Sequence, residues 1–353
     1  MRVGIVYTGV PNYMVDCWRA LSRQESVSLK IWTEDSGRYN VLGDSERRLE
    51  GLDAEVMQSK DITCDALKRV VAEIKEFAPD VLFVSGWSLR LPRYVAKSGV
   101  LRSIPKVLDF DMPWEWQFRK IAARFVLASY TRRFCAAFVP GRATRPYARW
   151  LGFGSDKVYG GRNCIDVNSY AGNGLGRKRI GFVFVGRFSG EKGIDVLVKA
   201  YSRYRTLVND SDDVWPLDMY GGGNLEPLFS DVEGVTVHGV TSPESLKEVY
   251  ARAGLLILPS LWEAWGVVLL EAAASGCPIV CSDKCGGRLD IVENGVNGLV
   301  VPAGNSDALA SAMYDVATGA KKFDGERGRK IANDYSCERW VRRVMQIVEN
   351  ERL

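Results

Sequence analysis

Short apolar runs rich in β-branched residues alternate with amphipathic helical patterns along almost the whole chain of 353 residues. The first half contains candidate strands at 3–7, 29–32, 81–84, 107–110 and 137–139, with helical patterns at 64–77 and 116–134. The second half contains candidate strands at 181–185, 217–220, 235–238, 255–258, 279–281 and 299–301, with a helical pattern at 194–207. Alternation of this kind predicts parallel sheets that are covered by helices on both faces.

The alternation restarts near residue 180, after a segment at 170–179 that is rich in glycine and basic residues and is typical of a linker. The chain is therefore predicted to form two doubly wound, Rossmann-like α/β domains of similar size that face a cleft. Ligands of such sheets bind beyond the carboxyl ends of the strands.

Composition excludes several other classes of protein. With 46% hydrophobic and 25% charged residues the chain is not a disordered one, and a net charge of +4 does not by itself indicate a nucleic-acid binder. The eight cysteines are scattered, unlike those of small disulfide-rich secreted domains. The first apolar run is too short for a signal peptide, and the stretch at 254–281 is interrupted by prolines and glutamates. We expect a soluble cytoplasmic protein with reduced thiols.

A glycine-containing loop at 186–193 (GRFSGEKG) separates a candidate strand from a candidate helix. This arrangement presents free backbone N–H groups to an anion, and Arg187 and Lys192 add two cations at the same place. The loop is neither a P-loop nor a dinucleotide fingerprint. Binding of a phosphate or diphosphate is one interpretation, and an ordinary turn with solvated charges is the other.

The segment 259–276 (PSLWEAWGVVLLEAAASG) contains two glutamates separated by seven residues, Glu263 and Glu271. A short helix is expected from about Gly266 to Gly276, because glycine commonly ends a helix. Glu271 falls inside this apolar helix, where burial of an unpaired carboxylate is costly. It either accepts hydrogen bonds from a ligand in a cleft or pairs with a buried arginine.

These two segments in combination resemble the retaining family 4 glycosyltransferases of the GT-B fold. The similarity extends to a glycine-rich turn at 220–224, to 235–260, to 285–313 and to the segment NCIDVNSY at 163–170, and it is much weaker before residue 160. It implies an acceptor-binding domain at 1–168 that is completed by a returning helix at 338–353. It also implies a donor-binding domain for a nucleotide-sugar at 169–337.

The resemblance implies a role for individual residues of the donor site. Arg187 and Lys192 match the cations that hold the donor diphosphate, Glu271 matches the carboxylate that binds the ribose hydroxyls, and Glu263 matches the one that faces the transferred sugar. The other implied donor contacts are Gly186, Gly222, Val240, Trp265, Gly266, Val267 and Val268. No metal or other cofactor is implied, since cations and helix N–H groups can stabilise the departing diphosphate.

The chain departs from the family in its first domain. Many members have a histidine after the strand that corresponds to 107–110, where it contacts the donor sugar, whereas the one histidine of this chain is His238. Asp111 or Asp109 could take over that catalytic position as a hydrogen-bond acceptor for sugar hydroxyls, or could serve as a helix cap or turn residue. Two metal-like patterns, DFD at 109–111 and the cysteines at 277, 281 and 285, are minor alternatives to a site without metal.

The segment 116–155 contains eight lysines and arginines and no acidic residue, which leaves a net charge of −4 for the rest of the chain. Within it Phe118, Ile121, Phe125 and Leu127 alternate with cations in a predicted amphipathic helix. Such a helix can bind an anionic membrane surface, and a solvated helix face is the alternative interpretation. Nucleic-acid binding is not favoured, because no recognition module accompanies the cations.

The sequence thus predicts a retaining, metal-independent hexosyl- or other glycosyltransferase. It would move a sugar from a UDP- or GDP-sugar to a glycan or lipid-linked acceptor in bacterial cell-surface polysaccharide or lipopolysaccharide assembly, at the inner face of the membrane. A catalytically silent subunit that binds a nucleotide-sugar is the alternative. A dinucleotide-dependent oxidoreductase is disfavoured, because no GxGxxG follows a candidate strand.

Overall fold

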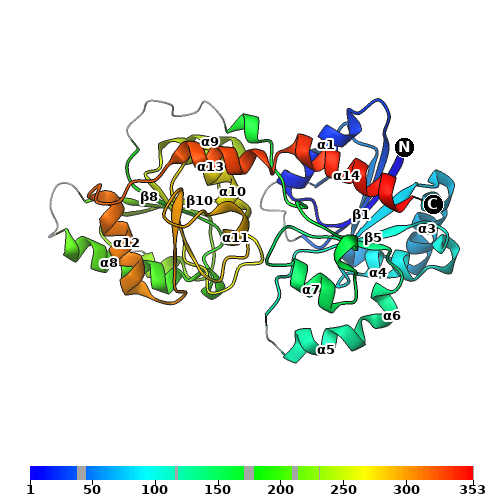
Figure 1. The fold of residues 1–353 in the computed structure, drawn as a ribbon, viewed down its shortest axis with the longest axis horizontal. Helices are drawn as coiled ribbons and strands as arrows, with labels where there is room; N and C mark the ends of the chain where they lie inside the picture. Colours follow the sequence, from blue (N-terminus) through cyan, green and yellow to red (C-terminus); the bar gives the residue numbers. More distant parts are fainter. Residues whose placement is uncertain (38–44, 116–117, 171–178, 209–213, 230, 353) are drawn as a thin grey trace. The chain divides into compact units, whose positions relative to one another are not determined.

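The chain divides into two compact units in the computed structural model, which describes residues 1–37, 45–115, 118–170, 179–208, 214–229 and 231–352 (Figure 1). Unit 1 comprises Met1–Asp166 and Ser336–Leu353, and unit 2 comprises Val167–Tyr335. The unit boundaries fall two residues before those expected from the sequence. Most of the expected linker, 171–178, lies outside the described residues.

Unit 1 contains a parallel sheet in the order β3-β2-β1-β4-β5-β6-β7 among its described residues. The strands are β1 (Arg2–Thr8), β2 (Ser28–Asp35), β3 (Ala54–Gln58), β4 (Val81–Ser85), β5 (Lys106–Asp109), β6 (Ala136–Phe138) and β7 (Val158–Tyr159). The sequence analysis missed β3 and β7. The first has two polar residues among its five, and the second has only two residues, so neither produces a strong apolar run.

Unit 1 contains helices between these strands and one more, α14, near the C-terminus. They are α1 (Asn12–Ser22), α2 (Ser45–Arg48), α3 (Cys64–Phe77), α4 (Arg90–Lys97), α5 (Phe118–Val126), α6 (Ala128–Thr131), α7 (Arg145–Trp150) and α14 (Cys337–Glu351). The helix α3 has the predicted bounds because the Thr63 side chain caps its first turn and Ala78 ends it in a left-handed conformation. The single helix expected at 116–134 is instead two helices, α5 and α6, that meet at Leu127.

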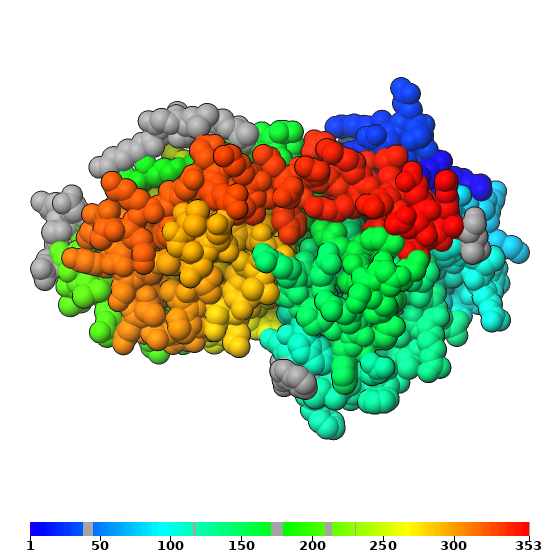
Figure 2. Space-filling model, viewed as in Figure 1, coloured from blue at the N-terminus to red at the C-terminus, as the bar shows by residue number. Residues whose placement is uncertain are grey.

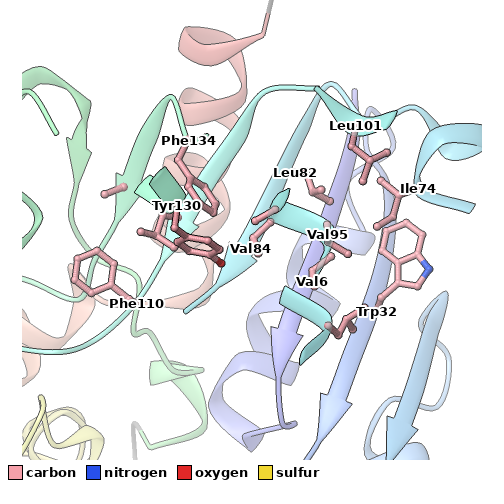
Figure 3. Close-up of a cluster of buried hydrophobic side chains, with 14 of the residues drawn as sticks. Val6, Trp32, Ile74, Leu82, Val84, Val95, Leu101, Phe110, Tyr130 and Phe134 are labelled. Atoms are coloured by element: carbon pink, nitrogen blue, oxygen red, sulfur yellow. The ribbon is translucent and has the colours of Figure 1, made fainter. Parts of the chain in front are cut away.

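The core of unit 1 lies between the sheet and the helices that cover it (Figure 3). Figure 3 shows Trp32 of β2, Ile74 of α3 and Leu82 of β4 among the buried side chains of this cluster. Trp87 and Trp114 pack against the same cluster, and their rings contact Tyr147. Both tryptophans therefore contribute to the core of unit 1.

The C-terminal helix α14 belongs to unit 1, and in Figure 2 it lies at the surface (red) beside the blue N-terminal segment and a green segment of the same unit. Its first residue, Cys337, has its sulfur 3.6 Å from the sulfur of Cys17 on α1. Near its last turn, the Glu351 carboxylate accepts hydrogen bonds from Lys157 and from the Tyr159 hydroxyl. Contacts at both ends therefore hold α14 on unit 1.

Unit 2 contains a second parallel sheet, in the order β10-β9-β8-β11-β12-β13 among its described residues. Its strands are β8 (Phe182–Val185), β9 (Leu217–Tyr220), β10 (Val235–Gly239), β11 (Leu255–Leu258), β12 (Ile279–Ser282) and β13 (Gly298–Val301). Its helices are α8 (Ile194–Leu207), α9 (Pro243–Arg252), α10 (Val267–Ala274), α11 (Arg288–Ile291), α12 (Ser306–Ala317) and α13 (Gly325–Asn333). All six strands were predicted within one residue at each end.

The strand order of unit 2 reverses between β8 and β11. From β8 the chain moves outward through β9 to β10, and it then returns to the other side of β8 to form β11. The loops that follow β8 and β11 therefore leave the same edge of the sheet toward opposite sides. Open α/β sheets bind their ligands at such a reversal, beyond the carboxyl ends of the strands. No helix in the described part of the chain is both long and apolar enough to cross a membrane.

Candidate functional site

The loop after β8 carries the two predicted cations at the strand-order reversal of unit 2. It begins at Gly186 and ends at Gly193, whose positive φ of 68° starts α8. Arg187 is exposed and forms an ion pair with Glu191 of the same loop. Lys192 is largely buried and forms an ion pair with Glu263. The loop thus presents one solvent-facing cation and one that is fixed by a partner.

The loops after β8 and β11 are packed directly against each other. The backbone N–H groups of Leu261 and Trp262 donate to the Glu191 carbonyl oxygen, at 2.8 and 3.1 Å. A Cβ atom at Gly193 would overlap the Pro259 carbonyl oxygen, so glycine is required there both for space and for its positive φ. This close approach explains why Lys192 and Glu263, 71 residues apart in sequence, are in contact.

The position of Glu263 is fixed by hydrogen bonds of its backbone N–H and carbonyl groups. Its N–H donates to the Lys284 carbonyl oxygen at 3.2 Å, and its carbonyl oxygen accepts from the Gly286 N–H at 3.1 Å. The side chains of Glu263 and Lys192 are each less than one-sixth exposed. The pair is therefore preorganised, and Lys192 keeps further N–H groups for an anion at the mouth of the loop.

The helix α10 begins at this site without a side-chain cap. Gly266, with φ of 87°, precedes its first residue, and no side chain accepts a hydrogen bond from the first turn. Val267 and Val268 are half-buried in that turn, whose N–H groups are suited to an anion. The Trp265 indole is only 1% exposed and donates to Asp290 at 3.1 Å, so Trp265 can offer only its backbone to a ligand. Asp290 positions that backbone, a role that the sequence analysis did not identify.

Glu271, in the middle of α10, is bound by tyrosines. The Tyr250 hydroxyl donates to its carboxylate at 2.8 Å, and the Tyr170 hydroxyl forms a second hydrogen bond. Burial raises the pKa of Glu271, and these hydrogen bonds together with the nearby Lys247 ammonium oppose that shift. The partner suggested as one alternative from the sequence, a buried arginine, is wrong. The carboxylate is kept in a defined orientation by two neutral donors.

Tyr250, Tyr170 and Lys247 are thus candidate site residues that the sequence analysis missed. Tyr250 lies on α9 and is fully buried, and Lys247, one turn earlier on α9, places its ammonium 5.6 Å from the ring centre of Tyr170. One signal was present in the sequence. A buried tyrosine hydroxyl needs a partner, and Glu271 is a polar residue inside an otherwise apolar helix of the same domain.

The glycine-rich turn after β9 packs on the loop after β8. The Phe188 N–H donates to the Gly222 carbonyl oxygen at 2.9 Å, and a Cβ atom on Gly221 would overlap the Gly186 carbonyl oxygen. A Cβ atom on Gly222 itself would meet no atom within 4 Å. Val240, which follows β10, is 55% exposed. The predicted contacts at Gly186, Gly222 and Val240 therefore lie at or beyond the carboxyl ends of β8, β9 and β10.

Asp109 and Asp111 lie in unit 1, at and just beyond the end of β5. Asp109 is buried and forms an ion pair with the buried Arg162, which also donates to the Asn163 side chain at 2.6 Å and to the Tyr7 hydroxyl. Burial raises the pKa of Asp109, and Arg162 opposes that shift. Asp109 is therefore a structural partner of Arg162, and the half-buried Asp111 is the remaining candidate for the place of the histidine.

His238 and the cysteines have local partners. The His238 ring stacks on Tyr220 with 4.4 Å between ring centres, and its Nε2 lies 2.6 Å from an Asp218 oxygen. Within the ranges that the structure describes, no group of three or more histidine, cysteine, aspartate or glutamate side chains is arranged to hold a metal. Neither pattern that suggested a metal from the sequence forms such a group there.

The basic segment 116–155 differs in detail from its prediction. Residues 116 and 117 lie outside the described part, and Lys120 is buried with its ammonium 2.7 Å from Glu115, so its charge is neutralised. On α5, at the margin of unit 1 in Figure 1, Phe118, Phe125 and Val126 are 85%, 75% and 76% exposed. The exposed Arg119 and Arg124 lie on the same helix as these solvent-facing apolar side chains.

Comparisons with known proteins agree with this description. Residues 171–327 match the family model described as glycosyl transferases group 1. A glycosyltransferase of Methanocaldococcus jannaschii, MJ1607, is 32% identical over 47% of this chain and 43% of its own length. A phosphatidyl-myo-inositol mannosyltransferase of Mycobacterium leprae is 28% identical over 67% of this chain and 61% of its own length. The matched part of the chain thus spans less than two thirds of either relative.

The solved structures show the fold over the whole chain. The crystal structure of Anabaena Alr3699/HepE in complex with UDP has a TM-score of 0.76, with 99% of this chain and 100% of that chain covered, at 16% identity. Two parallel-sheet, Rossmann-like domains of the GT-B type, as predicted from the sequence, are thereby confirmed, and residues 171–327 carry the similarity to group 1 glycosyltransferases.

Proposed function

We propose that the protein is a retaining, metal-independent glycosyltransferase that transfers a sugar from a UDP- or GDP-sugar. The observation that carries this proposal is the contact of Lys192 with Glu263 at the strand-order reversal of unit 2, next to the uncapped start of α10, the helix that also carries Glu271. That arrangement combines a cation and helix N–H groups for a diphosphate with carboxylates for hydroxyl groups. The similarity to a protein solved with UDP supports the same donor class.

The donor would occupy this site in a defined orientation. Glu271, oriented by Tyr250 and Tyr170, accepts hydrogen bonds from the ribose hydroxyls, while Lys192 and Arg187 bind the diphosphate. Glu263 faces the transferred sugar and keeps Lys192 in place. As the sugar–phosphate bond breaks, negative charge grows on the departing diphosphate, and fixed cations and N–H groups stabilise it without reorganisation. We assign no protein nucleophile.

The acceptor would bind to unit 1 and is a glycan or a lipid-linked molecule, as in bacterial cell-surface polysaccharide or lipopolysaccharide assembly. The similar mannosyltransferase of M. leprae is named for a phosphatidylinositol acceptor, which supports a lipid-linked class. The exposed apolar residues of α5 among surrounding arginines support peripheral binding to an anionic membrane from the cytoplasmic side.

A subunit that binds a nucleotide-sugar without transferring it is the second candidate. The observation that favours it is the burial of Asp109 against Arg162, which leaves Asp111 as the one candidate for the place of the family histidine. The two candidates differ in donor hydrolysis. A transferase slowly hydrolyses its donor in the absence of acceptor, and Asp111→Ala would lower that rate, whereas a silent subunit only binds.

The donor site is tested by a thermal-shift screen against UDP, GDP and their sugars. A ligand at 100 times its Kd adds about 2.7 kcal/mol to stability, which is a readily measured shift. We expect Lys192→Ala and Glu271→Ala to abolish the shift. Lys199→Ala, which removes an exposed lysine of α8, serves as the matched control and keeps it. Equal shifts in all three variants would contradict the site assignment.

A further inference from the structure

A cavity of about 290 Å³ is present in unit 1, at the edge of the sheet where the strands begin. Its wall includes Cys135, immediately before β6, and Lys157, immediately before β7. Both residues mark the amino ends of their strands, whereas open α/β sheets bind substrates at the carboxyl ends. The remaining wall comes from α6, from the last turn of α5 and from the loop after α7. Neither the donor nor the acceptor site accounts for this cavity.

Three cations from separate segments line the cavity: Arg124, Arg132 and Lys157. The Arg124 guanidinium is fixed by a 3.1 Å hydrogen bond to the Trp150 carbonyl oxygen and by stacking over the Trp150 ring, with 5.4 Å to the ring centre. Arg132 follows α6 and is exposed, and its guanidinium has no hydrogen bond or ion pair with any described residue.

Lys157 is positioned by α14. Its ammonium lies 2.9 and 3.0 Å from the two carboxylate oxygens of the buried Glu351, which leaves one of its three N–H groups for another partner. A second carboxylate, Asp156, is exposed beside Gly154 of the cavity wall. Burial raises the pKa of the Cys135 thiol to about 11, so the thiol adds no charge at neutral pH. The positive groups therefore outnumber the negative ones at the cavity.

We propose that this cavity binds the phosphate group of a small phosphate ester. Three cations that line the cavity can provide charge-assisted hydrogen bonds to phosphate oxygens, and the volume is close to the lower limit for small-molecule sites. The ester can be a free metabolite or the headgroup of a phospholipid, and glycerol phosphate is common to both. Because Lys157 would share its ammonium between the ligand and Glu351, occupation of the cavity is coupled to the docking of the last turn of α14.

The test compares two neighbouring arginines of the full-length chain. Arg132→Gln removes a cation that lines the cavity, and Arg133→Gln removes the same charge from the next residue, which is exposed and does not line it. Both side chains are on the surface, so both variants are expected to fold. Binding of glycerol 3-phosphate is measured by titration calorimetry. Recovery with vesicles of phosphatidylglycerol, and of phosphatidylcholine as the neutral control, is measured by flotation.

We expect Arg132→Gln to weaken one of these interactions at least fivefold while Arg133→Gln changes it less than twofold. Weaker glycerol 3-phosphate binding identifies a free phosphate ester, and a loss confined to phosphatidylglycerol vesicles identifies a lipid headgroup. Since a phosphate bound at the donor loop would respond equally in both variants, the comparison isolates the cavity. Equal behaviour of the two variants in both measurements would overturn the proposal.

Discussion

The hydrogen bond from Tyr250 to Glu271 has a measurable consequence for donor binding. Tyr250→Phe removes the hydroxyl and little else, because the ring is fully buried and keeps its packing. A hydrogen bond to a charged group contributes about 1.5–3 kcal/mol. Tyr170 and Lys247 still support the carboxylate in the variant, so the lower end applies. About 1.5 kcal/mol corresponds to roughly a tenfold change in an equilibrium constant.

The sign of the effect follows from the pKa of Glu271. Burial already raises this pKa, and the Tyr250 hydrogen bond opposes the shift, so its loss raises the pKa further. The ionised carboxylate is the form that accepts hydrogen bonds from ribose hydroxyls. UDP affinity therefore falls as the pH is lowered through the pKa of Glu271, and in Tyr250→Phe it falls at a higher pH than in the wild type. Below both midpoints the variant binds UDP roughly tenfold more weakly, and the difference vanishes as the pH rises above them.

Calorimetric titration of UDP at a series of pH values, extended to acid pH until the affinity has fallen, measures both midpoints. The matched control is Tyr201→Phe, another buried tyrosine of unit 2, whose hydroxyl contacts the Trp215 and Gly234 carbonyl oxygens and not Glu271. Glu271→Gln is expected to flatten the acid limb of the profile altogether. Coincident midpoints for the Tyr250→Phe and Tyr201→Phe variants would refute the reasoning.

Three further predictions concern other parts of the molecule. Phe118→Ser combined with Phe125→Ser is expected to reduce flotation with anionic vesicles by more than half, because both side chains face solvent. The control is Val100→Ser, which changes an exposed residue elsewhere in unit 1. Equal recovery of all variants would contradict membrane binding through α5. Arg162→Met leaves the buried Asp109 without its partner, so the free energy of unfolding measured in urea is expected to fall by about 3–5 kcal/mol. Adding Asp109→Asn is expected to restore part of that free energy. A decrease of less than about 1 kcal/mol would argue against a stabilising role of the ion pair. Donor hydrolysis is expected to be unchanged by a chelator, and a loss that Mg²⁺ or Mn²⁺ restores would refute the metal-independent mechanism.

Most of the fold followed from local patterns. The bounds of α3 were predicted from helical periodicity, and the cap that Thr63 provides explains why the helix starts where it does. The strands β8 and β11 of unit 2 are continuous apolar runs with every residue buried, as expected of strands covered on both faces. The two strands that the sequence analysis missed are explained by the same dependence on local apolar runs. Neither β3 nor β7 has an apolar run of its own, and both are recognised only by pairing with β2 and β6.

The helix predicted at 116–134 failed for a different reason. Periodicity assigned Phe118, Ile121, Phe125 and Leu127 to one apolar face, and the chain breaks at Leu127, which packs against the core of unit 1. Phe118 and Phe125 then point to solvent. Which apolar residues of an amphipathic segment become buried depends on the surface that the rest of the domain provides, and a local pattern does not contain that surface.

The candidate site shows the same division between features of the local sequence and contacts formed only in the tertiary structure. The loop at 186–193 and the two glutamates were selected as candidates from residue types and spacing, since a glycine loop between strand and helix can present N–H groups to an anion. The side chains that these residues contact could not be identified from the sequence. Glu271 contacts Tyr250, 21 positions away, and Asp109 contacts Arg162, 53 positions away.

The sequence by itself predicted the two α/β domains, the strands of unit 2 and a set of candidate residues for binding a diphosphate and hydroxyl groups. Only the tertiary structure decided that Lys192 meets Glu263, that tyrosines orient Glu271, that Asp109 is occupied by Arg162, and that cations converge on a cavity at the far edge of the sheet in unit 1. The physical reason is the separation along the chain over which each kind of interaction acts. Apolar periodicity and glycine conformation act over a few residues, whereas these contacts depend on which strands become neighbours, and strand order is a property of the assembled sheet.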